Sequence, residues 1–341
     1  MTRGYFLRLS ASLLAVVIIT GSLFLLRSHV STSPDFVATS SSQSLIIEVP
    51  AGATGSDIAN LLAKAGIIKS FSAFFKLAVS DSRSSQVAPG AHRLDVGICA
   101  KCALDQLLDA KRIPNLVKVA EGAWSSEIMS DLVSKGWKKS DVEVALTHIS
   151  IPSVFSGSEG VLFPAQYSFA SGTSAAVVLQ AMANRFTSEA TSSGITSGTS
   201  EFSPMALLTI ASIIQAEGDA ADFAKISRVI RNRLKLGMQL QLDTTVHYIL
   251  KSRGHVFLST AATQVASPYN TYRHFGLPPG PIGNPGKAAM VAAVNPAQGD
   301  WIYFITVKPG DTRFTKSDAQ FLMWKSEYEK NLRAGAFGAK Q

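Results

Sequence analysis

An uncharged segment near the start of the chain limits the arrangement of everything that follows it. Residues Leu9–Leu26 carry no charged side chain, and a helix of that length rises about 27 Å, which nearly spans the hydrocarbon of a bilayer. Arg3 and Arg8 precede the segment, and Arg27 follows it. Because positive charge gathers on the cytoplasmic side of membrane proteins, this pattern favours a single transmembrane helix with a cytoplasmic N-terminus.

The segment predicts a topology for the whole chain. We expect a cytoplasmic tip and transmembrane anchor over residues 1–30 and a flexible stalk over residues 31–44. Everything after the anchor then lies on the periplasmic or extracytoplasmic side of the membrane. A cleaved signal peptide is the alternative, although its apolar core is usually shorter and no A-x-A site follows Leu26.

The composition is that of a folded protein. Hydrophobic residues make up 46% of the 341 residues and charged residues 16%, and the net charge of +8 suits an anionic polymer or a membrane surface. No nucleic-acid module or arginine-rich run accompanies that charge, and no Gly-rich phosphate loop occurs. We therefore expect no nucleic-acid partner and no cofactor.

The two cysteines, Cys99 and Cys102, form a C-x-x-C pair. A zinc site needs two further ligands, and none of the six histidines falls in a matching cluster. Two interpretations remain open: two small residues at the start of a helix, or a local disulfide in an oxidising compartment.

A repeat with an offset of seventy residues lies in the first half of the chain. Residues 45–68 (LIIEVPAGATGSDIANLLAKAGII) resemble residues 115–137 (NLVKVAEGAWSSEIMSDLVSKGW). Each copy predicts a strand, a glycine turn and an amphipathic helix that ends at glycine. Such units outside the cytoplasm favour a LysM-like glycan-binding region over residues 45–150. A small α+β spacer without a ligand is the alternative.

Helix and strand patterns also alternate in the rest of the chain. They predict a mixed α+β catalytic or binding domain over residues 151–341. The fold class expected is therefore α+β, with one N-terminal transmembrane helix, a LysM-like strand–helix repeat region and a mixed α+β C-terminal domain.

One carboxylate in this domain has an unusual predicted environment. The segment Ser203–Glu217 begins with an N-cap serine and a proline, is apolar on most sides and ends before Gly218. Glu217 lies in its last turn, where the helix dipole, burial and the nearby Asp219 and Asp222 disfavour the ionised form. A carboxyl group protonated near neutral pH suits general acid catalysis at a glycosidic oxygen.

The alternative is that Glu217 is an exposed helix-end residue or pairs with Arg228 or Arg231. Together with Arg233, these arginines belong to the next helix. Three charges on one helix cannot all face a core, so we expect them on a solvated face. Binding of an anionic substrate group by one of them is the alternative.

Polar side chains mark the two segments that follow. Gln239, Gln241 and Asp243 alternate with leucines, which predicts a strand with three polar side chains on one face within residues 237–250. The loop Tyr269–Pro285 (YNTYRHFGLPPGPIGNP) contains four prolines and is therefore rigid.

These segments together resemble the YceG/MltG family of endolytic murein transglycosylases. The resemblance rests on EGVLFPAQYSF, ASIIQAEG, RVIRNRLKLGMQLQLDTTVHY, YNTYRHFGLPPGPIGNPG and AAVNPA, in that order. It implies a lyase of the bacterial inner membrane that cleaves MurNAc–GlcNAc bonds within nascent glycan strands. The products carry 1,6-anhydroMurNAc ends, and strand length is limited. Glu217 matches the catalytic glutamate of the family.

The resemblance also implies roles for the proline-rich loop as one wall of the glycan site. Tyr269 and Tyr272 would stack on sugar rings, and Asn270 and Asn284 would bind acetamide or hydroxyl groups. Packing of the tyrosines onto the domain is the alternative.

Asp243 is the only acid in the matched motifs that follow Glu217, and we assign it and Gln241 to substrate binding or positioning. The implied partners are peptidoglycan strands, the membrane and the polymerases of wall synthesis. A non-catalytic, membrane-anchored scaffold that binds peptidoglycan is the main alternative function. A cytoplasmic lyase acting on a small metabolite fits neither the anchor nor the missing cofactor motif.

The sequence departs from the family pattern at several positions. Gln215 stands where many relatives have Glu, and Thr244 stands where they often have Pro. Thr312, Gln320 and Phe321 replace a His, a Glu and a His. If those polar residues support the site in relatives, we expect weaker activity or an altered substrate preference here.

Overall fold

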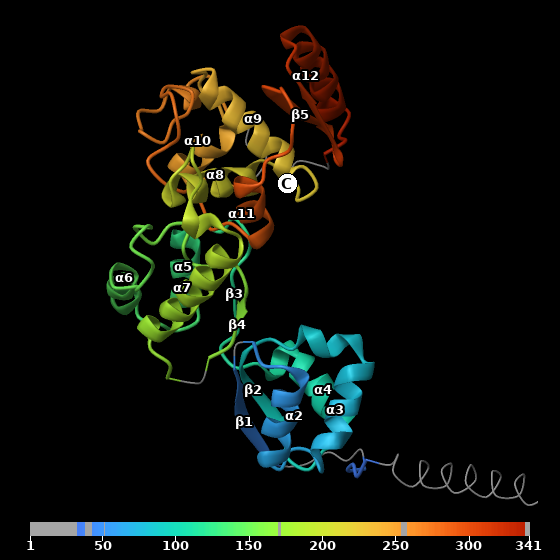
Figure 1. Ribbon diagram of the computed structural model, residues 1–341. Coiled ribbons are helices and arrows are strands. Elements are labelled where there is room, and N and C mark those ends of the chain that lie inside the picture. The colour runs from blue at the N-terminus through green and yellow to red at the C-terminus, as the bar shows by residue number, and fades with distance from the viewer. Residues whose placement is uncertain (1–32, 38–42, 51, 170–171, 254–257, 338–341) are drawn as a thin grey trace, which may run out of the picture. The chain divides into compact units, whose positions relative to one another are not determined.

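The computed structural model describes residues 33–37, 43–50, 52–169, 172–253 and 258–337 (Figure 1). The chain divides into two compact units, residues 1–116 with 167–171 (unit 1) and residues 117–166 with 172–341 (unit 2). This division falls within the predicted 45–150 region. The architecture is mixed α+β, as the sequence predicts, with eleven α-helices and three two-stranded sheets among the described residues.

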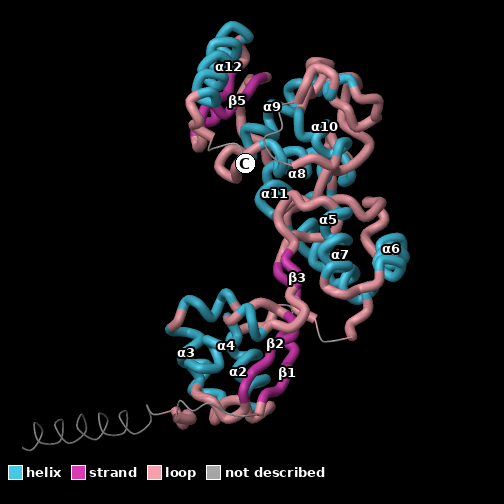
Figure 2. Tube along the Cα trace, turned by 180° about the vertical axis from the view of Figure 1, so that it is seen from behind, coloured by secondary structure: helices cyan, strands magenta, loops and turns pink. Residues whose placement is uncertain are grey.

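Unit 1 is a two-stranded antiparallel sheet covered by helices. Strands β1 (Ser44–Val49) and β2 (Gly90–Asp95) pair antiparallel, with Ile47 opposite His92, and lie side by side in Figure 2. Its helices are α2 (Gly55–Lys64), α3 (Phe71–Ser80) and α4 (Ala100–Leu108), with the 3-10 turns η1 (Ser82–Gln86) and η2 (Ala110–Arg112). The core consists of side chains from both layers, among them Leu62, Phe74, Leu94 and Leu104.

The cysteines belong to unit 1. Cys99 and Cys102 form a disulfide at the start of α4. Asp35 accepts hydrogen bonds from the backbone amide of Ala100 at 3.0 and 3.1 Å, which satisfies an otherwise free donor of the first helical turn. The disulfide interpretation of the C-x-x-C pair is confirmed.

Unit 2 is mainly helical. The short strands β3 (Val117–Lys118) and β4 (Gln166–Tyr167) pair with each other, and β5 (Tyr303–Lys308) and β6 (Asp311–Thr315) form an antiparallel hairpin. Its helices are α5 (Ser125–Ser134), α6 (Lys139–Thr147), α7 (Ala175–Ser192), α8 (Pro204–Glu217), α9 (Phe223–Lys235), α10 (Asp243–Leu250), α11 (Lys287–Val294) and α12 (Asp318–Arg333), with 3-10 turns η3 (Ile195–Ser197) and η4 (Ala262–Gln264).

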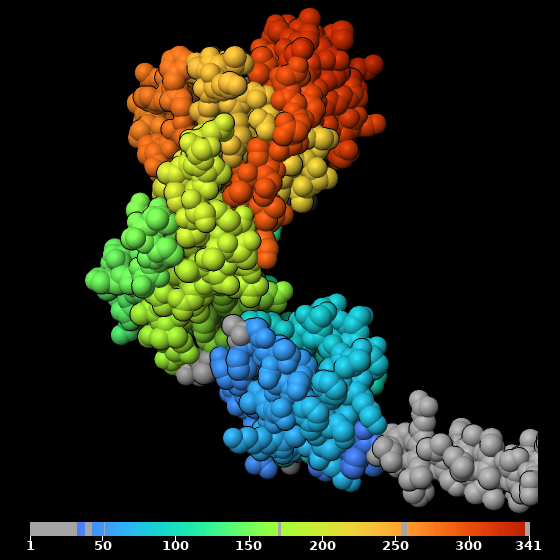
Figure 3. Space-filling view, viewed as in Figure 1, coloured from blue at the N-terminus to red at the C-terminus, as the bar shows by residue number. Residues whose placement is uncertain are grey.

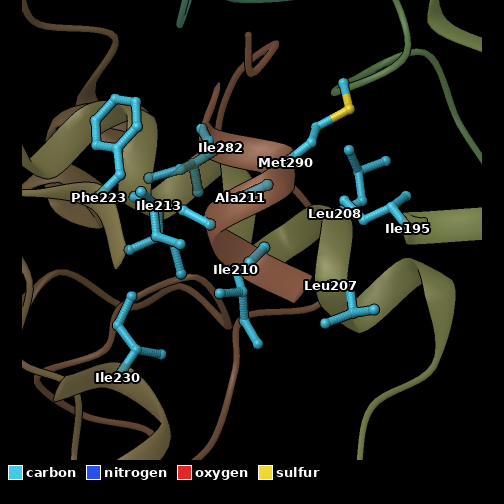
Figure 4. Close-up of a cluster of buried hydrophobic side chains, with 14 of the residues drawn as sticks. Ile195, Leu207, Leu208, Ile210, Ala211, Ile213, Phe223, Ile230, Ile282 and Met290 are labelled. Atoms are coloured by element: carbon cyan, nitrogen blue, oxygen red, sulfur yellow. The ribbon is translucent and has the colours of Figure 1, made fainter. Parts of the chain in front are cut away.

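Helix α8 is the centre of this unit. Ser203 caps it by accepting a hydrogen bond from the amide of Ala206, and Pro204 occupies its first turn. All residues from Leu207 to Ile214 are buried, and Ile210 and Ile213 lie among side chains of the neighbouring helices in Figure 4. By contrast, no residue of α12 is buried, and α12 lies at the surface in Figure 3 (red).

The seventy-residue repeat is visible as local structure. Each copy has a strand, a glycine with positive φ (Gly52 at 78°, Gly122 at 76°) and a helix. In both copies the carboxylate at the third helical position accepts a hydrogen bond from a backbone amide three residues earlier. Asp57 accepts from the amide of Thr54, and Glu127 accepts from the amide of Trp124. The two helices, α2 and α5, belong to different units. A LysM-like identity stays a prediction.

Two expectations about secondary structure and burial are wrong. Within residues 237–250 the strand is reduced to one isolated bridge between Gln239 and Phe275, and helix α10 begins at Asp243. Leu240 and Leu242 are buried between more exposed polar residues, as the alternation predicts. However, Gln241 has a φ of 48°, which is incompatible with an extended strand. Arg231 and Arg233 are buried, because their guanidinium groups donate to backbone carbonyls inside the unit.

The predicted anchor, stalk boundary and N-terminal topology concern residues that are mostly outside the described part of the chain. Among the described residues, no helix combines the length and hydropathy needed to span a bilayer.

Candidate functional site

Glu217 is the last residue of α8, and its environment follows from the packing of that helix. A Cβ at the next residue, Gly218, would lie 2.5 Å from Ile226 Cδ1, so the helix end packs closely on α9. The Glu217 side chain is partly buried, and its Oε1 accepts a hydrogen bond from the hydroxyl of Thr244 in α10.

Burial raises the pKa of Glu217 from 4.5 to about 7, and the charge of Asp243 acts in the same direction. Hydrogen bonds from Thr244 and the charge of Arg233 act against that rise. The predicted direction of the shift is thus present, but its electrostatic part comes from Asp243 and not from the expected Asp219 and Asp222. Near neutral pH a substantial fraction of Glu217 carries a proton.

Arg233 links this carboxyl to the C-terminal hairpin. Its guanidinium donates to the carbonyl oxygens of Ile302, at 2.6 Å, and Leu240, at 2.5 Å, and lies 5.5 Å from the ring centre of Tyr303. Burial lowers the pKa of Arg233. Neither Arg228 nor Arg231 pairs with Glu217: Arg228 donates to the carbonyl of Ala297, and Arg231 pairs with Glu201 at 2.9 Å.

Asp243 and Tyr272 form a second hydrogen-bonded pair beside Glu217. The phenol of Tyr272 donates to Oδ1 of the exposed Asp243. Burial and this hydrogen bond raise the pKa of Tyr272. Gln241, two residues before Asp243, is also exposed, and its backbone amide donates to the carbonyl of Thr271 at 3.1 Å. These contacts bring α10 and the proline-rich loop together.

Both asparagines of the loop are fully buried and bonded within the protein. The Asn270 amide donates to the carbonyls of Thr263 and Val265, and the Asn284 carbonyl oxygen accepts from the amide of Leu162 at 2.8 Å. In this structure they fix the loop and offer no group to a ligand, so direct substrate contact by them does not fit.

The tyrosine at the start of the loop packs on the domain. Tyr269 is partly buried, and its ring lies 5.2 Å from that of Tyr248 in α10. The Tyr248 ring in turn lies 6.1 Å from that of Trp124, which gives a row of three aromatic rings.

A partly buried hydrogen-bond network that includes Tyr248 was not predicted from the sequence. Glu159, from the EGVLFPAQYSF segment, accepts hydrogen bonds from the amide of Ser125 and the phenol of Tyr248, at 3.0 and 3.1 Å. Burial raises the pKa of Glu159. Thr244 and Arg233 were likewise not assigned to the site, because their roles depend on which helix ends meet. The departure from the family pattern at Thr244 was the only feature of the sequence that pointed to its role beside Glu217.

The other departing positions also have contacts within unit 2. Gln215 accepts a hydrogen bond from the amide of Gly286 at 3.0 Å. Thr312 and Thr306 form a cross-strand hydroxyl pair at 2.9 Å, Gln320 accepts from Thr315 at 2.6 Å, and the Phe321 ring stacks on that of Tyr303. Gln320 and Phe321 thus pack α12 against the hairpin, whereas Gln215 contacts the residue before α11.

The described residues contain no group of three or more His, Cys, Asp or Glu side chains arranged to hold a metal ion. The arrangement supplies one carboxyl that titrates near neutral pH, with hydroxyl and phenol groups around it. Such a group can give a proton to a leaving oxygen and later take one back.

Glu217, at the end of a buried helix and with a pKa of about 7, defines this α+β protein as one equipped for acid–base chemistry. The chain belongs to the YceG-like family, which it matches over residues 47–327.

Individual relatives agree with this assignment. The chain is 30% identical over 305 residues to an endolytic murein transglycosylase of Bacillus subtilis, covering 83% of this chain and 84% of that protein. It is 32% identical over 152 residues to an endolytic murein transglycosylase of Streptococcus pneumoniae, covering 43% of this chain and 28% of that protein. The crystal structure of a putative yceG-like protein from Listeria monocytogenes superposes with a TM-score of 0.55 at 26% identity, covering 82% of this chain and 99% of that one.

Proposed function

We propose that this protein is an endolytic murein transglycosylase that cleaves MurNAc–GlcNAc bonds within nascent glycan strands and so limits their length. The observation that carries the proposal is Glu217, whose pKa of about 7 leaves it able to act as an acid and then as a base. The family membership and the names of the relatives support the same reaction.

The reaction uses one protein carboxyl. Glu217 gives its proton to the glycosidic oxygen as the bond from that oxygen to the muramyl C1 breaks. The C6 hydroxyl oxygen of the same sugar then bonds to C1, and its proton passes to the Glu217 carboxylate. The product has a 1,6-anhydro end, the enzyme regains its starting state, and no water is consumed.

The muramyl acetamide supplies the assistance to C1 that a second carboxylate supplies in many glycoside hydrolases. Asp243 is held by Tyr272 and raises the Glu217 pKa, so we assign it to positioning. Gln241 is exposed beside it and is assigned to substrate binding, together with the partly exposed Tyr272, whereas Tyr269 packs against Tyr248.

We further propose that residues 9–26 anchor the protein in the bacterial plasma membrane with the N-terminus in the cytoplasm. The catalytic unit then lies on the extracytoplasmic side, beside the polymerases that make its substrate. The uncharged segment and its arginine flanks support this topology.

The test is digestion of uncrosslinked glycan strands by the purified full-length protein, read by mass spectrometry. Anhydro-ended fragments are expected from wild type and from Glu143→Gln, a control at an exposed glutamate of α6, and none from Glu217→Gln. Reducing-end fragments would instead indicate a hydrolase and make Asp243 the candidate for its second carboxylate. Strand binding without cleavage by wild type would favour the non-catalytic scaffold.

A further inference from the structure

An open pocket of about 390 Å³ lies in unit 2, away from the residues that surround Glu217. Its charged lining residues are Lys118, Glu121, Glu127, Asp131 and Arg253, and short apolar side chains line the rest. The pocket therefore offers both signs of charge around an apolar floor, which suits a ligand that carries both signs itself.

Arg253 is fixed in one orientation at the rim of this pocket. Its Nε and Nη2 atoms donate to Glu127 at 2.8 and 2.6 Å, and Nη2 also donates to the carbonyl of Gly122 at 2.8 Å. The guanidinium lies 3.8 Å from the ring centre of Trp124, which is 5% exposed. Its Nη1 atom makes no hydrogen bond to the part of the chain that is described.

Two further charges at the pocket have no ion-pair partner among the described residues. Lys118 is an exposed cation, and Glu121 is an exposed anion whose carboxylate lies against Gly286. By contrast, Glu127 is paired with Arg253, and Asp131 lies 3.7 Å from the ammonium of Lys135. The unpaired groups are thus one donor of Arg253, one ammonium and one carboxylate.

The pocket lies within reach of a sugar bound at Glu217. Helix α10 starts at the Glu217–Thr244 contact, and its eight residues extend about 12 Å to an end near Trp124. Tyr248, in the last turn of this helix, lies 6.1 Å from Trp124 between ring centres. A tripeptide spans about 10 Å when extended, and the lactyl group that joins it to a muramyl residue adds to that length.

We propose that this pocket binds the short peptide that muramyl residues of murein carry, a deepening that rests on the proposed function. Lys118 and the Nη1 group of Arg253 bind a peptide carboxylate, Glu121 binds the amine of the diamino acid, and the apolar floor accepts its methyl groups. The enzyme is therefore selective for glycan strands that still carry their peptides.

The inference is tested by calorimetric titration of the full-length protein with the free tripeptide released from murein by an amidase. Lys118→Gln is expected to weaken binding about fivefold, because an exposed ion pair is lost. Lys118→Arg is expected to bind as wild type does, and so is Lys138→Gln, which alters an exposed lysine that does not line the pocket. No binding by wild type, or equal binding by Lys118→Gln, would overturn the peptide site.

A second measurement separates this inference from the proposed function. Cleavage rates are compared on strands with peptides and on strands stripped of them. A several-fold preference of wild type for peptide-bearing strands, reduced in Lys118→Gln, is expected. If wild type cleaves neither substrate, the proposed function fails while the titration still decides the peptide site; equal rates on both substrates contradict the inferred selectivity alone.

Discussion

Thr244, the second residue of α10, donates its hydroxyl hydrogen to Glu217, the last residue of α8. The donor stabilises the ionised carboxylate and so opposes the effect of burial. The pKa of Glu217 is therefore set by opposing effects. Burial and Asp243 raise it, whereas Thr244 and Arg233 lower it.

Replacement of Thr244 by Val removes the donor at nearly constant volume. The Glu217 pKa should rise above its present value of about 7, because burial and Asp243 are then less opposed. The alkaline limb of the pH–rate profile of glycan cleavage should move to higher pH. Thr244→Ser keeps the hydroxyl and should retain the wild-type limb; a limb that moves equally in both variants would contradict this account.

Asp243→Asn should have the opposite effect. It removes a negative charge that raises the Glu217 pKa, so the alkaline limb should move to lower pH. Tyr272→Phe provides the control, since it deletes the phenol that bonds Asp243 but leaves the charge in place. We expect Tyr272→Phe to change the limb less than Asp243→Asn does, as measured in the same rate profiles.

The raised pKa of Glu217 also predicts how stability depends on pH. The folded state holds this proton more tightly than the unfolded state, so its stabilising contribution is complete below pH 4.5 and is lost as pH rises through about 7. The loss is between about 3 and 4 kcal/mol, from roughly 1.4 kcal/mol per pKa unit. The Glu217→Gln variant should not show this loss. The free energies of unfolding of variant and wild type, measured in urea, should therefore differ more at pH 8 than at pH 4.5. An equal difference at both values would contradict the shift.

The proline-rich loop packs on Gly160, which precedes the VLFP residues. Gly160 has a φ of 89°, and a Cβ there would lie 2.7 Å from Pro281 Cγ. Gly160→Ala should destabilise unit 2 by about 2 kcal/mol or more in thermal or urea unfolding, through strain and overpacking together. Gly157→Ala is the matched control, with a φ of 76° and nothing within 4 Å of its Cβ. A similar loss in both variants would show that the close contact with Pro281 is unimportant.

Local patterns in the sequence predict much of this protein. The Ser203 cap, the buried α8 and the position of Glu217 at its end follow from residue types and spacing. The repeat predicts two strand–turn–helix segments because glycines and apolar residues act locally. The two copies of the repeat belong to different units. That division depends on contacts between residues distant in sequence, which the spacing of residue types within each copy does not predict.

The site itself is less predictable, for the same reason. Arg233 was expected on a solvated face, yet it is buried because the carbonyls of Leu240 and Ile302 converge on it. Asn270 and Asn284 are typical of binding loops, but backbone groups of other segments occupy their amides. Helix α10 replaces a predicted strand because Gln241 adopts a left-handed conformation that no local residue pattern requires.

The bond from Arg233 to the carbonyl of Ile302 has a consequence for how this enzyme can vary. Arg233 lowers the Glu217 pKa, and its own position depends on the residue just before β5. A change in how the β5–β6 hairpin packs therefore alters the pKa of Glu217, which lies more than eighty positions earlier in the chain. This change requires no substitution in the motifs that contain Glu217 and Arg233. The C-terminal segment acts as a tuning element, so variants of this protein with different hairpins can work at different pH.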